Sequence, residues 1–385
     1  MGAWRRGERM DAYVTTGGQF LPGPPFGTAA MGDFIGHLSE RSDRLGRMVL
    51  RQNGIKTRHY AINVDGTTEW TLAKLGAEAA RNCLGKAEID GGELGLLATA
   101  TTQNDLMVPG LASGVHHALG LPPLEIASHQ SVCGSAMMAL KNAALQVHAD
   151  EHRAALALGA EFSSRFFRPG FYLGTDAIND AGELSGDGEF LRWTLSDGAA
   201  ALIVEPKPAR HRLSLKIDWI SIRSFADRFG PCMTGGAVRQ ADGAMKPWSH
   251  FASIGDAAQA GAFQLRQDVD ALHRMLPVWV GELMRLIDEG RIETRKVDYF
   301  VCHYSAKSLR EEMVRLATRA GCMIDEERWF TNLPTKGNVG AASLFLLLDD
   351  LLDDPRLKPG QRVLVAVPES GQCLMGYAGM TVVER

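Results

Sequence analysis

One of the six cysteines in the sequence stands where a nucleophile would be placed. Cys133 lies in the segment Ser131-Val-Cys-Gly-Ser135, between a strand-like stretch and the start of a helix. Partial positive charge at a helix N-terminus favours the thiolate, which is the reactive form of cysteine. The placement therefore indicates nucleophilic chemistry. The alternative is a small packed residue, which is the commoner role of a cysteine at a helix start.

Two further side chains complete a candidate catalytic set. His303 follows the apolar stretch 297–302, where a buried strand would emerge at a cleft, and Asn338 lies in Lys336-Gly-Asn-Val-Gly340. Each has an ordinary alternative, a histidine at the rim of the core and an asparagine at a helix N-cap or turn. Together with the cysteine they supply a nucleophile, a base and an amide donor at matched points of two similar halves.

The elements that would position these side chains occur twice in the same order. Helices are expected at 72–83, after Cys133, at 271–288 and from Gly340, and strands at 94–101, 154–159, 297–302 and 363–367. The spacing from strand end to catalytic loop is about 32 residues in the first half and about 35 in the second. We therefore predict an α/β protein with two duplicated halves, 10–206 carrying the cysteine and 207–385 carrying the histidine and asparagine. A chance succession of strands and helices is the alternative to duplication.

Composition narrows the class of protein. Of 385 residues 45% are hydrophobic and 22% are charged, and the net charge of −4 provides no global basic field, so we expect neither nucleic acid nor membrane as a partner. No apolar run approaches the roughly 18 residues of a membrane span. The start lacks a signal-peptide core, so we expect a cytoplasmic protein beginning at Met1 or Met10. The cysteines are scattered without Cys-x-x-Cys pairs, so we expect no disulfide framework, no metal and no cofactor.

Several motifs resemble those of thiolase-fold condensing enzymes, and most of all β-ketoacyl-acyl-carrier-protein synthase III. They are Ala100-Thr-Thr102, the Cys133 loop, Leu195-Ser-Asp-Gly-Ala199, His303 after its strand, and Gly337-Asn-Val-Gly-Ala-Ala-Ser343. The resemblance runs over nearly the whole chain. It implies a thiolase fold, with two similar halves in a five-layered αβαβα arrangement, and a homodimer.

The resemblance also implies a role for each site residue. Cys133 would carry the acyl group, while His303 and Asn338 would bind the thioester oxygen that becomes an enolate. The backbone N–H groups of Cys133 and Gly371 would form a second oxyanion hole, which stabilises charge that develops during acyl transfer.

Three segments depart from the pattern of that family. Ser370-Gly371-Gln372 stands where a run of glycines is usual, Gly134 replaces the serine that usually follows the nucleophile, and Tyr304-Ser-Ala-Lys307 replaces a Gln-Pro-Asn type of run. A thiolase proper is disfavoured because Cys373 follows Gly371, whereas the second catalytic cysteine of thiolases precedes the late glycine run. We expect Cys373 to be a packing residue.

A narrower resemblance concerns the ketosynthase-cyclases of the dialkylresorcinol and stilbene pathways. It rests on Gln52-Asn-Gly-Ile-Lys-Thr-Arg-His-Tyr60, Ala160-Glu-Phe162 and Phe190-Leu-Arg-Trp-Thr-Leu-Ser-Asp197. It implies that a β-ketoacyl thioester is joined to a second, α,β-unsaturated acyl thioester and cyclised to a 2,5-disubstituted cyclohexane-1,3-dione. The substrates would be carried by acyl-carrier protein or CoA.

Glu161 would be the general base of such a reaction. It follows the strand expected at 154–159, and burial against an apolar cleft would raise the pKa of its carboxyl group toward that of a useful base. The alternative is a solvated carboxylate at a strand end. Other functions also stay open: a plain ketosynthase III with a malonyl donor, acyl transfer to oxygen or nitrogen, and a silent partner subunit of an active paralogue.

Two further groups of residues are candidates for substrate contacts. The aromatic residues that would line an acyl tunnel are Phe166, Phe167 and Tyr172. The alternative for these residues is packing in the core. Carrier-protein docking would use Arg266 and Arg274, which share one face if residues 264–284 form a helix, or it would use Lys307, Arg310 and Arg315. The alternative for each set is a solvated helix face.

Overall fold

The strands of the first half form one group of five within a ten-stranded sheet. A computed structural model describes residues 11–179, 184 and 186–385. The group runs, in sheet order, β5 (Glu125–Gln130), β4 (Leu96–Thr101), β6 (Ala155–Glu161), β7 (Gly198–Glu205) and β1 (Tyr13–Phe20). β4 pairs in parallel with β5 and β6, whereas β7 is antiparallel to both β6 and β1.

The second half repeats this pattern strand for strand. Its order is β14 (Trp329–Phe330), β13 (Tyr299–Cys302), β15 (Arg362–Glu369), β16 (Leu374–Val383) and β8 (Ser214–Ser224). β13 is parallel to β14 and β15, and β16 is antiparallel to β15 and β8. The two groups are joined by the short antiparallel pairing of β1 with β8 at Tyr13 and Val14. The shared order and directions give both halves one topology, and the predicted division at 206/207 falls between β7 and β8.

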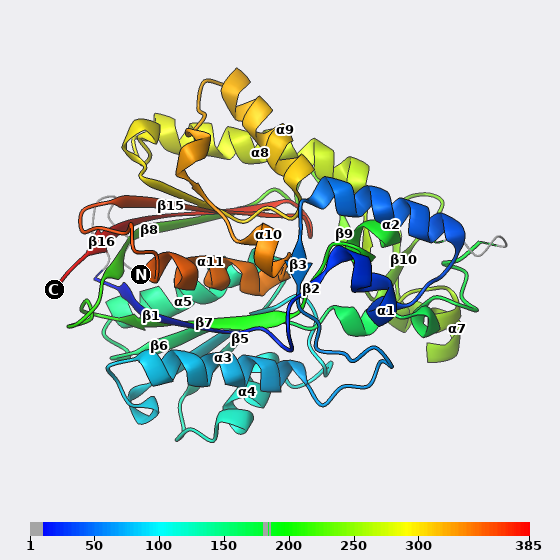
Figure 1. Ribbon diagram of the computed structural model, residues 1–385, viewed down its shortest axis with the longest axis horizontal. Coiled ribbons are helices and arrows are strands. Elements are labelled where there is room, and N and C mark those ends of the chain that lie inside the picture. Colours follow the sequence, from blue (N-terminus) through cyan, green and yellow to red (C-terminus); the bar gives the residue numbers. More distant parts are fainter. Residues whose placement is uncertain (1–10, 180–183, 185) are drawn as a thin grey trace.

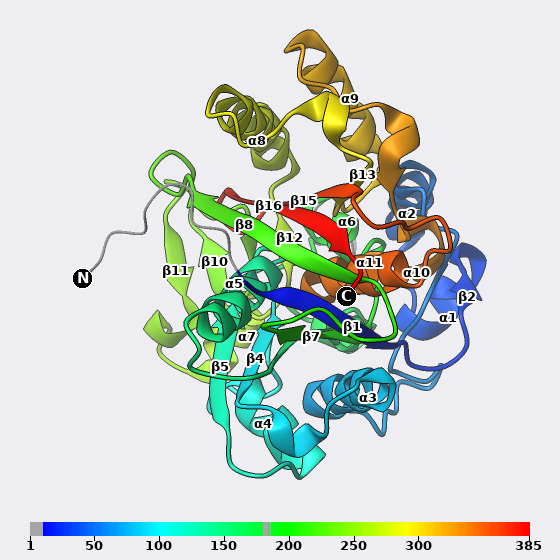
Figure 2. The ribbon, with the colours of Figure 1, turned by 90° about the vertical axis from the view of Figure 1, so that its left-hand side faces the viewer.

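Helices cover the two strand groups on both faces and also separate them. Figure 1 shows α8 (Val269–Asp288) and α9 (Lys307–Arg319) above the upper group and α3 (Leu72–Lys86) with α4 (Leu111–Leu119) below the lower one. Between the groups lie α5 (Ser135–His148) and α11 (Ser343–Leu352). The same order of layers is visible after the 90° turn of Figure 2. The five-layered αβαβα thiolase fold is thereby confirmed.

The two central helices are buried because each has a sheet on either side. In α11 the buried residues include Leu344, Phe345, Leu346, Leu347 and Leu348, so that apolar side chains point in every direction around the helix. A helix that is apolar all round belongs in the interior of a protein. Both central helices therefore have fixed N-termini, and it is at these N-termini that the predicted catalytic loops lie.

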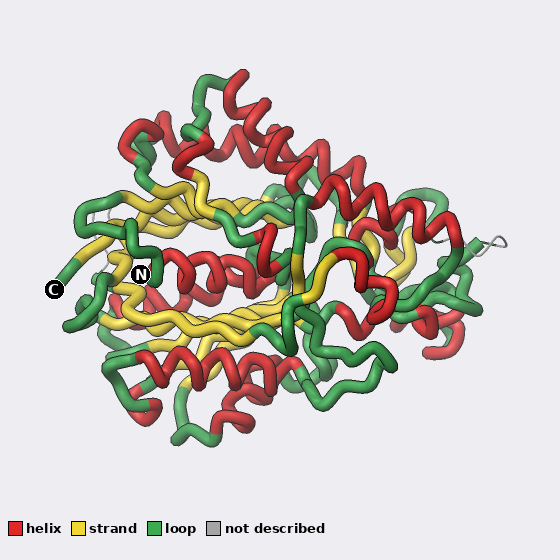
Figure 3. Tube along the Cα trace, viewed as in Figure 1, coloured by secondary structure: helices red, strands yellow, loops and turns green. Residues whose placement is uncertain are grey.

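The remaining elements gather at one end of the layers, where Figure 3 shows loops, short helices and the longer α2 (Glu40–Asn53). The helices are α1 (Met31–Ile35), α2 (Glu40–Asn53), α6 (Gly186–Arg192), α7 (Ile254–Gln259) and α10 (Leu333–Lys336). The strands are β2 (Phe26–Gly27), β3 (Thr57–Arg58), β9 (Met233–Thr234), β10 (Ala237–Arg239), β11 (Met245–Pro247) and β12 (Arg266–Gln267). In the described residues no helix is long and apolar enough to cross a membrane.

The helix expected at 271–288 is present as α8, but it does not extend back to residue 264, as a shared face for Arg266 and Arg274 would require. Its first residue is Val269, because the Asp268 side chain accepts a hydrogen bond from the Ala271 N–H and caps the helix there. Arg266 lies before this cap, in β12. Arg266 and Arg274 therefore do not share a helix face, which removes the reason for grouping them as a docking surface.

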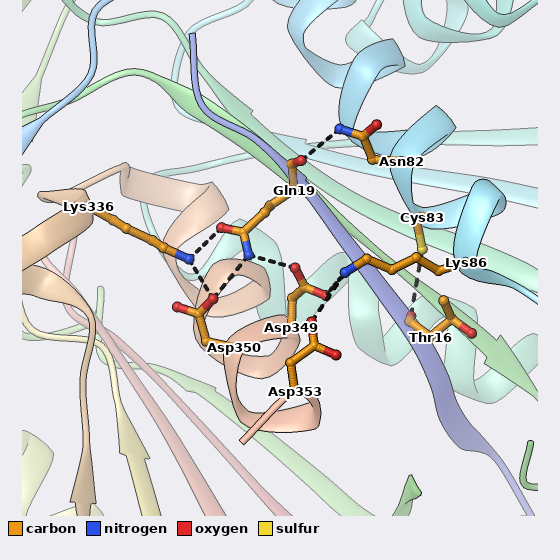
Figure 4. Close-up of polar contacts among 9 residues, drawn as sticks. All are labelled: Thr16, Gln19, Asn82, Cys83, Lys86, Lys336, Asp349, Asp350 and Asp353. Atoms are coloured by element: carbon orange, nitrogen blue, oxygen red, sulfur yellow. Dashed lines mark hydrogen bonds and ion pairs between the residues drawn. The ribbon is translucent and has the colours of Figure 1, made fainter. Parts of the chain in front are cut away.

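A polar network ties β1 to α10 and α11 (Figure 4). Lys336 donates hydrogen bonds to Gln19 and Asp350. Gln19 Nε2 donates to Asp349 Oδ2 at 2.7 Å and to Asp350 Oδ1 at 3.0 Å, and Lys86 Nζ lies 3.4 Å from Asp349 Oδ1. The network joins the first half of the chain to the segment that precedes the second catalytic loop.

Candidate active site

Cys133 and His303 meet at the ends of elements from opposite halves. Cys133 lies two residues before α5, and His303 directly follows β13. The backbone N–H of His303 donates to the carbonyl of Ala366 in β15, which extends the parallel pairing by one residue. This places His303 Nε2 3.1 Å from Cys133 Sγ, and both side chains are buried. A base in hydrogen-bond contact with a thiol is the arrangement that activates a nucleophile.

Asn338 lies in a turn whose backbone conformation requires glycine at the preceding position. Gly337 has a φ of 78°, and a Cβ at this position would overlap Ser196 Oγ. The Asn338 carbonyl accepts a hydrogen bond from Ser196 N–H at 2.8 Å, and its side-chain Oδ1 accepts one from Gly340 N–H at 3.1 Å. Because the amide oxygen is used in this way, the Nδ2 group is left as the donor toward the site.

Lys336, two residues before Asn338, anchors the same turn through the network of Figure 4. Its ammonium group and the Asp350 carboxylate are both largely buried, with 19% and 21% of their side chains exposed. The ion pair therefore fixes the end of α10 from which the Asn338 loop departs. Lys336 is a positioning residue that the sequence motifs did not reveal.

We expect Lys336→Gln to reduce condensation about 10-fold while leaving acyl transfer to Cys133 intact, because Cys133 lies on a different loop. Loss of a charged hydrogen bond should also lower the free energy of unfolding by about 1–3 kcal/mol. Denaturant unfolding and single-turnover assays measure the two effects. Lys358→Gln, at an exposed lysine, is the matched control. Unchanged condensation in a destabilised Lys336→Gln variant would refute the positioning role.

Glu161 occupies a buried position at the end of β6. Its Oε1 accepts hydrogen bonds from the Thr102 N–H at 2.9 Å, the Thr102 hydroxyl at 2.6 Å and the Ala341 N–H at 3.0 Å. Only 2% of the residue is exposed, and burial raises the pKa of its carboxyl group to about 7 despite these donors. The solvated alternative is thereby excluded, and the group can gain or lose a proton near neutral pH.

Burial shifts the pKa of His303 and that of Cys133 in opposite directions. Burial lowers the pKa of His303 to about 4, so its imidazole is neutral at pH 7. Burial first, and then the charges of Glu369 and Glu161, raise the pKa of the Cys133 thiol above its ordinary value. The helix N-terminus favours the thiolate of Cys133, whereas burial and the two carboxylates favour the thiol beside His303.

Two adjoining spaces surround these groups. A cavity of about 20 Å³, room for about one water molecule, is lined by Cys133, Glu161 and Asn338 among others. A cleft of about 860 Å³ lies next to it and is lined in part by Phe166 and Gly371. Both spaces are lined by Thr102, Val132 and Met233. A thioester in the cleft would therefore reach the sulfur past these three residues.

The backbone donors predicted for an oxyanion hole are available. Among the described residues, the backbone N–H of Cys133 donates no hydrogen bond to another backbone group. The same holds for the backbone N–H of Gly371. Gly371 faces the cleft. Both N–H groups can therefore serve a bound oxygen, and their role stays a prediction.

The remaining predicted residues divide between the cleft, the core and the surface. Phe166 lines the cleft, whereas Phe167 and Tyr172 are fully buried, and Phe167 belongs to the core packed around α3. Cys373 is buried, as expected of a packing residue. The second candidate docking set, on or near α9, carries little free charge because each member is in an ion pair. The pairs are Lys307 with Glu311, Arg310 with Glu326 and Arg315 with Glu312.

Comparisons with known proteins agree with this geometry. Residues 287–374 match the family described as 3-oxoacyl-[acyl-carrier-protein (ACP)] synthase III C terminal. The chain is 26% identical to the β-ketoacyl-[acyl-carrier-protein] synthase III of Rhodospirillum rubrum over 344 residues, which cover 87% of this chain and 90% of the relative.

Solved structures show the same fold. The tetronic acid condensing enzyme AbyA1 superposes with a TM-score of 0.74 at 21% identity, covering 96% of this chain and 99% of that one. OleA of Xanthomonas campestris, solved with lauric acid and lauroyl-CoA, superposes with a TM-score of 0.73 at 17% identity, covering 96% and 98%.

The chain therefore has the thiolase fold of the condensing enzymes. Its sequence is similar to ketosynthase III transferases over most of its length, so the chain is ketosynthase III-like. The special closeness to dialkylresorcinol and stilbene ketosynthase-cyclases predicted from the sequence is not established by these relatives.

Proposed function

We propose that this protein joins a β-ketoacyl thioester to an α,β-unsaturated acyl thioester and cyclises the product to a 2,5-disubstituted cyclohexane-1,3-dione. The observation that carries the proposal is the buried Glu161 carboxyl group, which lines the same small cavity as Cys133 and Asn338 and has a pKa of about 7. A malonyl donor forms its carbanion by losing carbon dioxide and needs no such base. A β-ketoacyl donor must lose a proton.

The first step loads the unsaturated acyl group onto Cys133. His303 Nε2, 3.1 Å from the sulfur, is placed to accept the thiol proton as the sulfur attacks the thioester carbonyl. The backbone N–H groups of Cys133 and Gly371 stabilise the oxyanion that forms. The proton leaves with the donor thiol, and the acyl group stays on the enzyme.

Condensation then uses His303, Asn338 and Glu161 together. Glu161 removes a proton from the α-carbon of the β-ketoacyl thioester. Once Cys133 is acylated, the neutral imidazole of His303 takes the tautomer with its proton on Nε2, and this N–H and Asn338 Nδ2 donate to the enolate oxygen. The α-carbon adds to the β-carbon of the enzyme-bound acyl group, and the protonated Glu161 returns its proton to the α-carbon of that group. A second deprotonation, at the γ-carbon, lets that carbon attack the Cys133 thioester, which closes the six-membered ring and frees the sulfur. Hydrolysis of the remaining thioester and loss of carbon dioxide leave the dione.

Acyl-carrier protein or CoA thioesters would deliver both substrates through the cleft, and the working form would be a homodimer in the cytoplasm. Support for the dimer comes from β5, an edge strand of the sheet, and from the neighbouring exposed apolar loop Leu106–Val108. Unpaired strand edges and exposed apolar loops are surfaces that subunit contacts cover.

The proposal is tested by giving the pure protein a β-ketoacyl-CoA and an (E)-2-enoyl-CoA and analysing the products by mass spectrometry. We expect a cyclic dione that contains carbon from both substrates. Elongation of acyl groups with a malonyl thioester, without cyclic product from the pair, would establish a plain ketosynthase instead.

His303→Ala and Asn338→Ala should each slow condensation about 10²-fold or more, the usual cost of removing a donor to a developing oxyanion. Because Cys133 is kept, the Asn338 variant should still accept an acyl group. Single-turnover assays, which follow the acyl-enzyme by intact mass, separate loading from condensation. Product formation at the parent rate by both variants would refute the enolate site. A normal rate in Asn338→Ala alone would favour simple acyl transfer to oxygen or nitrogen.

A further inference from the structure

Glu369 is a second buried carboxylate beside the nucleophile, and the proposed reaction steps do not use it. It is the last residue of β15, and 2% of it is exposed. Its Oε1 accepts a hydrogen bond from the Ser131 hydroxyl at 2.7 Å, and its Oε2 accepts one from the Gly134 N–H at 2.9 Å. A carboxylate of the second half is therefore bound to both sides of the turn that presents Cys133.

Two glycines make the space for this carboxylate. A Cβ at Gly134 would overlap Glu369 Oε2, and a Cβ at Gly371 would lie 2.8 Å from Oε1. The departure from the usual serine after the nucleophile is thus explained by Glu369, because any side chain at position 134 would displace the carboxylate. Gly134 and Glu369 form one local arrangement.

Glu369 also sets the charge around the sulfur. Within the described residues, the ionisable groups that act on Cys133 are His303 from the end of β13, Glu161 from the end of β6 and Glu369 from the end of β15, with no lysine or arginine among them. The N-terminus of α5 favours a thiolate at this position. A carboxylate bound to the Gly134 N–H occupies that same positive end and opposes the effect.

Glu369 also influences a second cysteine. Glu369 acts on the thiol of Cys373, whose further charged neighbours are Arg228 and Asp227. Burial raises the pKa of the Glu369 carboxyl group, while the donors Ser131, Gly134 and the Val132 N–H favour its charged form. The hydrogen bonds around Glu369 are thus those that an ionised carboxylate accepts.

An unsaturated acyl thioester offers a cysteine two electrophilic carbons. Attack on the carbonyl forms a sulfur–carbon bond, breaks the bond to the donor thiol and passes the thiol proton to that leaving group, so the enzyme gains only the acyl group. Attack on the β-carbon forms a sulfur–carbon bond and places the proton on the α-carbon. No bond to the donor then breaks, and the enzyme gains the whole thioester as an unproductive adduct.

Resting on the proposed function, we propose that Glu369 is a positioning residue that keeps Cys133 as a thiol hydrogen-bonded to His303. In this state the sulfur attacks the carbonyl carbon of an unsaturated thioester and not its β-carbon. A preformed thiolate could add to the β-carbon without any further help. A thiol must first give its proton to His303, and this transfer is coupled to attack at the carbonyl, next to the oxyanion donors. Glu369 therefore determines the chemical outcome without touching the substrate.

The test uses Glu369→Gln, which keeps the shape and one acceptor but removes the charge. Iodoacetamide alkylation of Cys133, followed by peptide mass against pH, should show a lower apparent pKa in the variant and about 10-fold faster alkylation at pH 7, since one pKa unit is tenfold in thiolate. With 2-octenoyl-CoA, the ratio of whole-thioester adduct to acyl adduct should rise about 10-fold. The control is Glu205→Gln, at the last residue of β7, whose carboxylate also accepts a hydroxyl hydrogen bond, from Thr15 at 2.5 Å.

Identical alkylation profiles for the parent and Glu369→Gln would overturn the inference. If that variant does not fold, the parent protein decides alone, because a Cys133 that alkylates with an apparent pKa below that of free cysteine, about 8.5, would equally overturn it. Absence of any adduct from 2-octenoyl-CoA on the folded parent would count against the proposed function. The alkylation profile would still decide the effect of Glu369.

Discussion

Cys133→Ala should fold normally and lose all covalent acylation and all product. Cys133 combines contact with a base, at 3.1 Å from His303 Nε2, with a place beside a substrate-sized cleft. Removing the nucleophile of an acyl-enzyme mechanism removes the whole reaction, whereas alanine in place of a small buried cysteine costs little in packing. Intact mass after incubation with acyl thioesters measures the adduct directly.

Cys322→Ala is the matched control, since Cys322 is also buried but lies in the turn after α9. This variant should acylate like the parent. Acylation that persists in Cys133→Ala and maps to Cys322 or Cys373 would contradict the assignment. A parent protein that never acylates would instead favour the silent partner subunit.

Glu161→Gln should keep acylation of Cys133 but form cyclic product about 10²–10⁴-fold more slowly, which is the usual contribution of a general base. Glutamine can still accept hydrogen bonds from Thr102 and Ala341 through its amide oxygen, so the fold around the site should survive. The lost function is proton removal. Product formation by Glu161→Gln at the parent rate would mean that another group removes the proton.

The pH dependence of the parent follows from the pKa of about 7 that burial gives Glu161. A base must be ionised to act, so cyclisation should rise with pH through about 7 and fall as Glu161 becomes protonated below it. His303, with a pKa of about 4, stays neutral over this range. The limb near pH 7 should be absent from Glu161→Gln and present in Glu205→Gln, and its persistence in Glu161→Gln would assign it to another group.

The fold and the proximity of Cys133, His303 and Asn338 could be predicted from the sequence because they depend on local patterns. Alternating apolar strands and amphipathic helices repeat in both halves, and Cys133, His303 and Asn338 each stand at a strand end or a helix start. The resemblance to condensing enzymes added the five layers. Cys133 contacts His303 because the parallel strands of both halves have their carboxyl ends on the same side of the molecule.

What the sequence could not reveal depends on contacts between distant segments. The helix N-terminus alone predicted a thiolate at Cys133, but Glu369, far away in the chain, occupies that N-terminus through Gly134. The sequence carried two signs of this contact, the unusual Gly134 and the altered glycine run after Glu369. Neither sign shows by itself that Glu369 and Gly134 are in contact. Likewise Arg266 fitted a helical spacing, whereas the cap at Asp268 decided where the helix begins.

The most direct test of the cyclising condensation is a chase of the acylated enzyme. Protein loaded with a 2-enoyl group on Cys133 is mixed with either a β-ketoacyl-CoA or malonyl-CoA, and the adduct and the products are followed by mass in a single turnover. The account predicts that the β-ketoacyl-CoA clears the adduct with formation of the cyclic dione, and that malonyl-CoA leaves the adduct in place. Clearance by malonyl-CoA with release of carbon dioxide, and none by the β-ketoacyl-CoA, would contradict it.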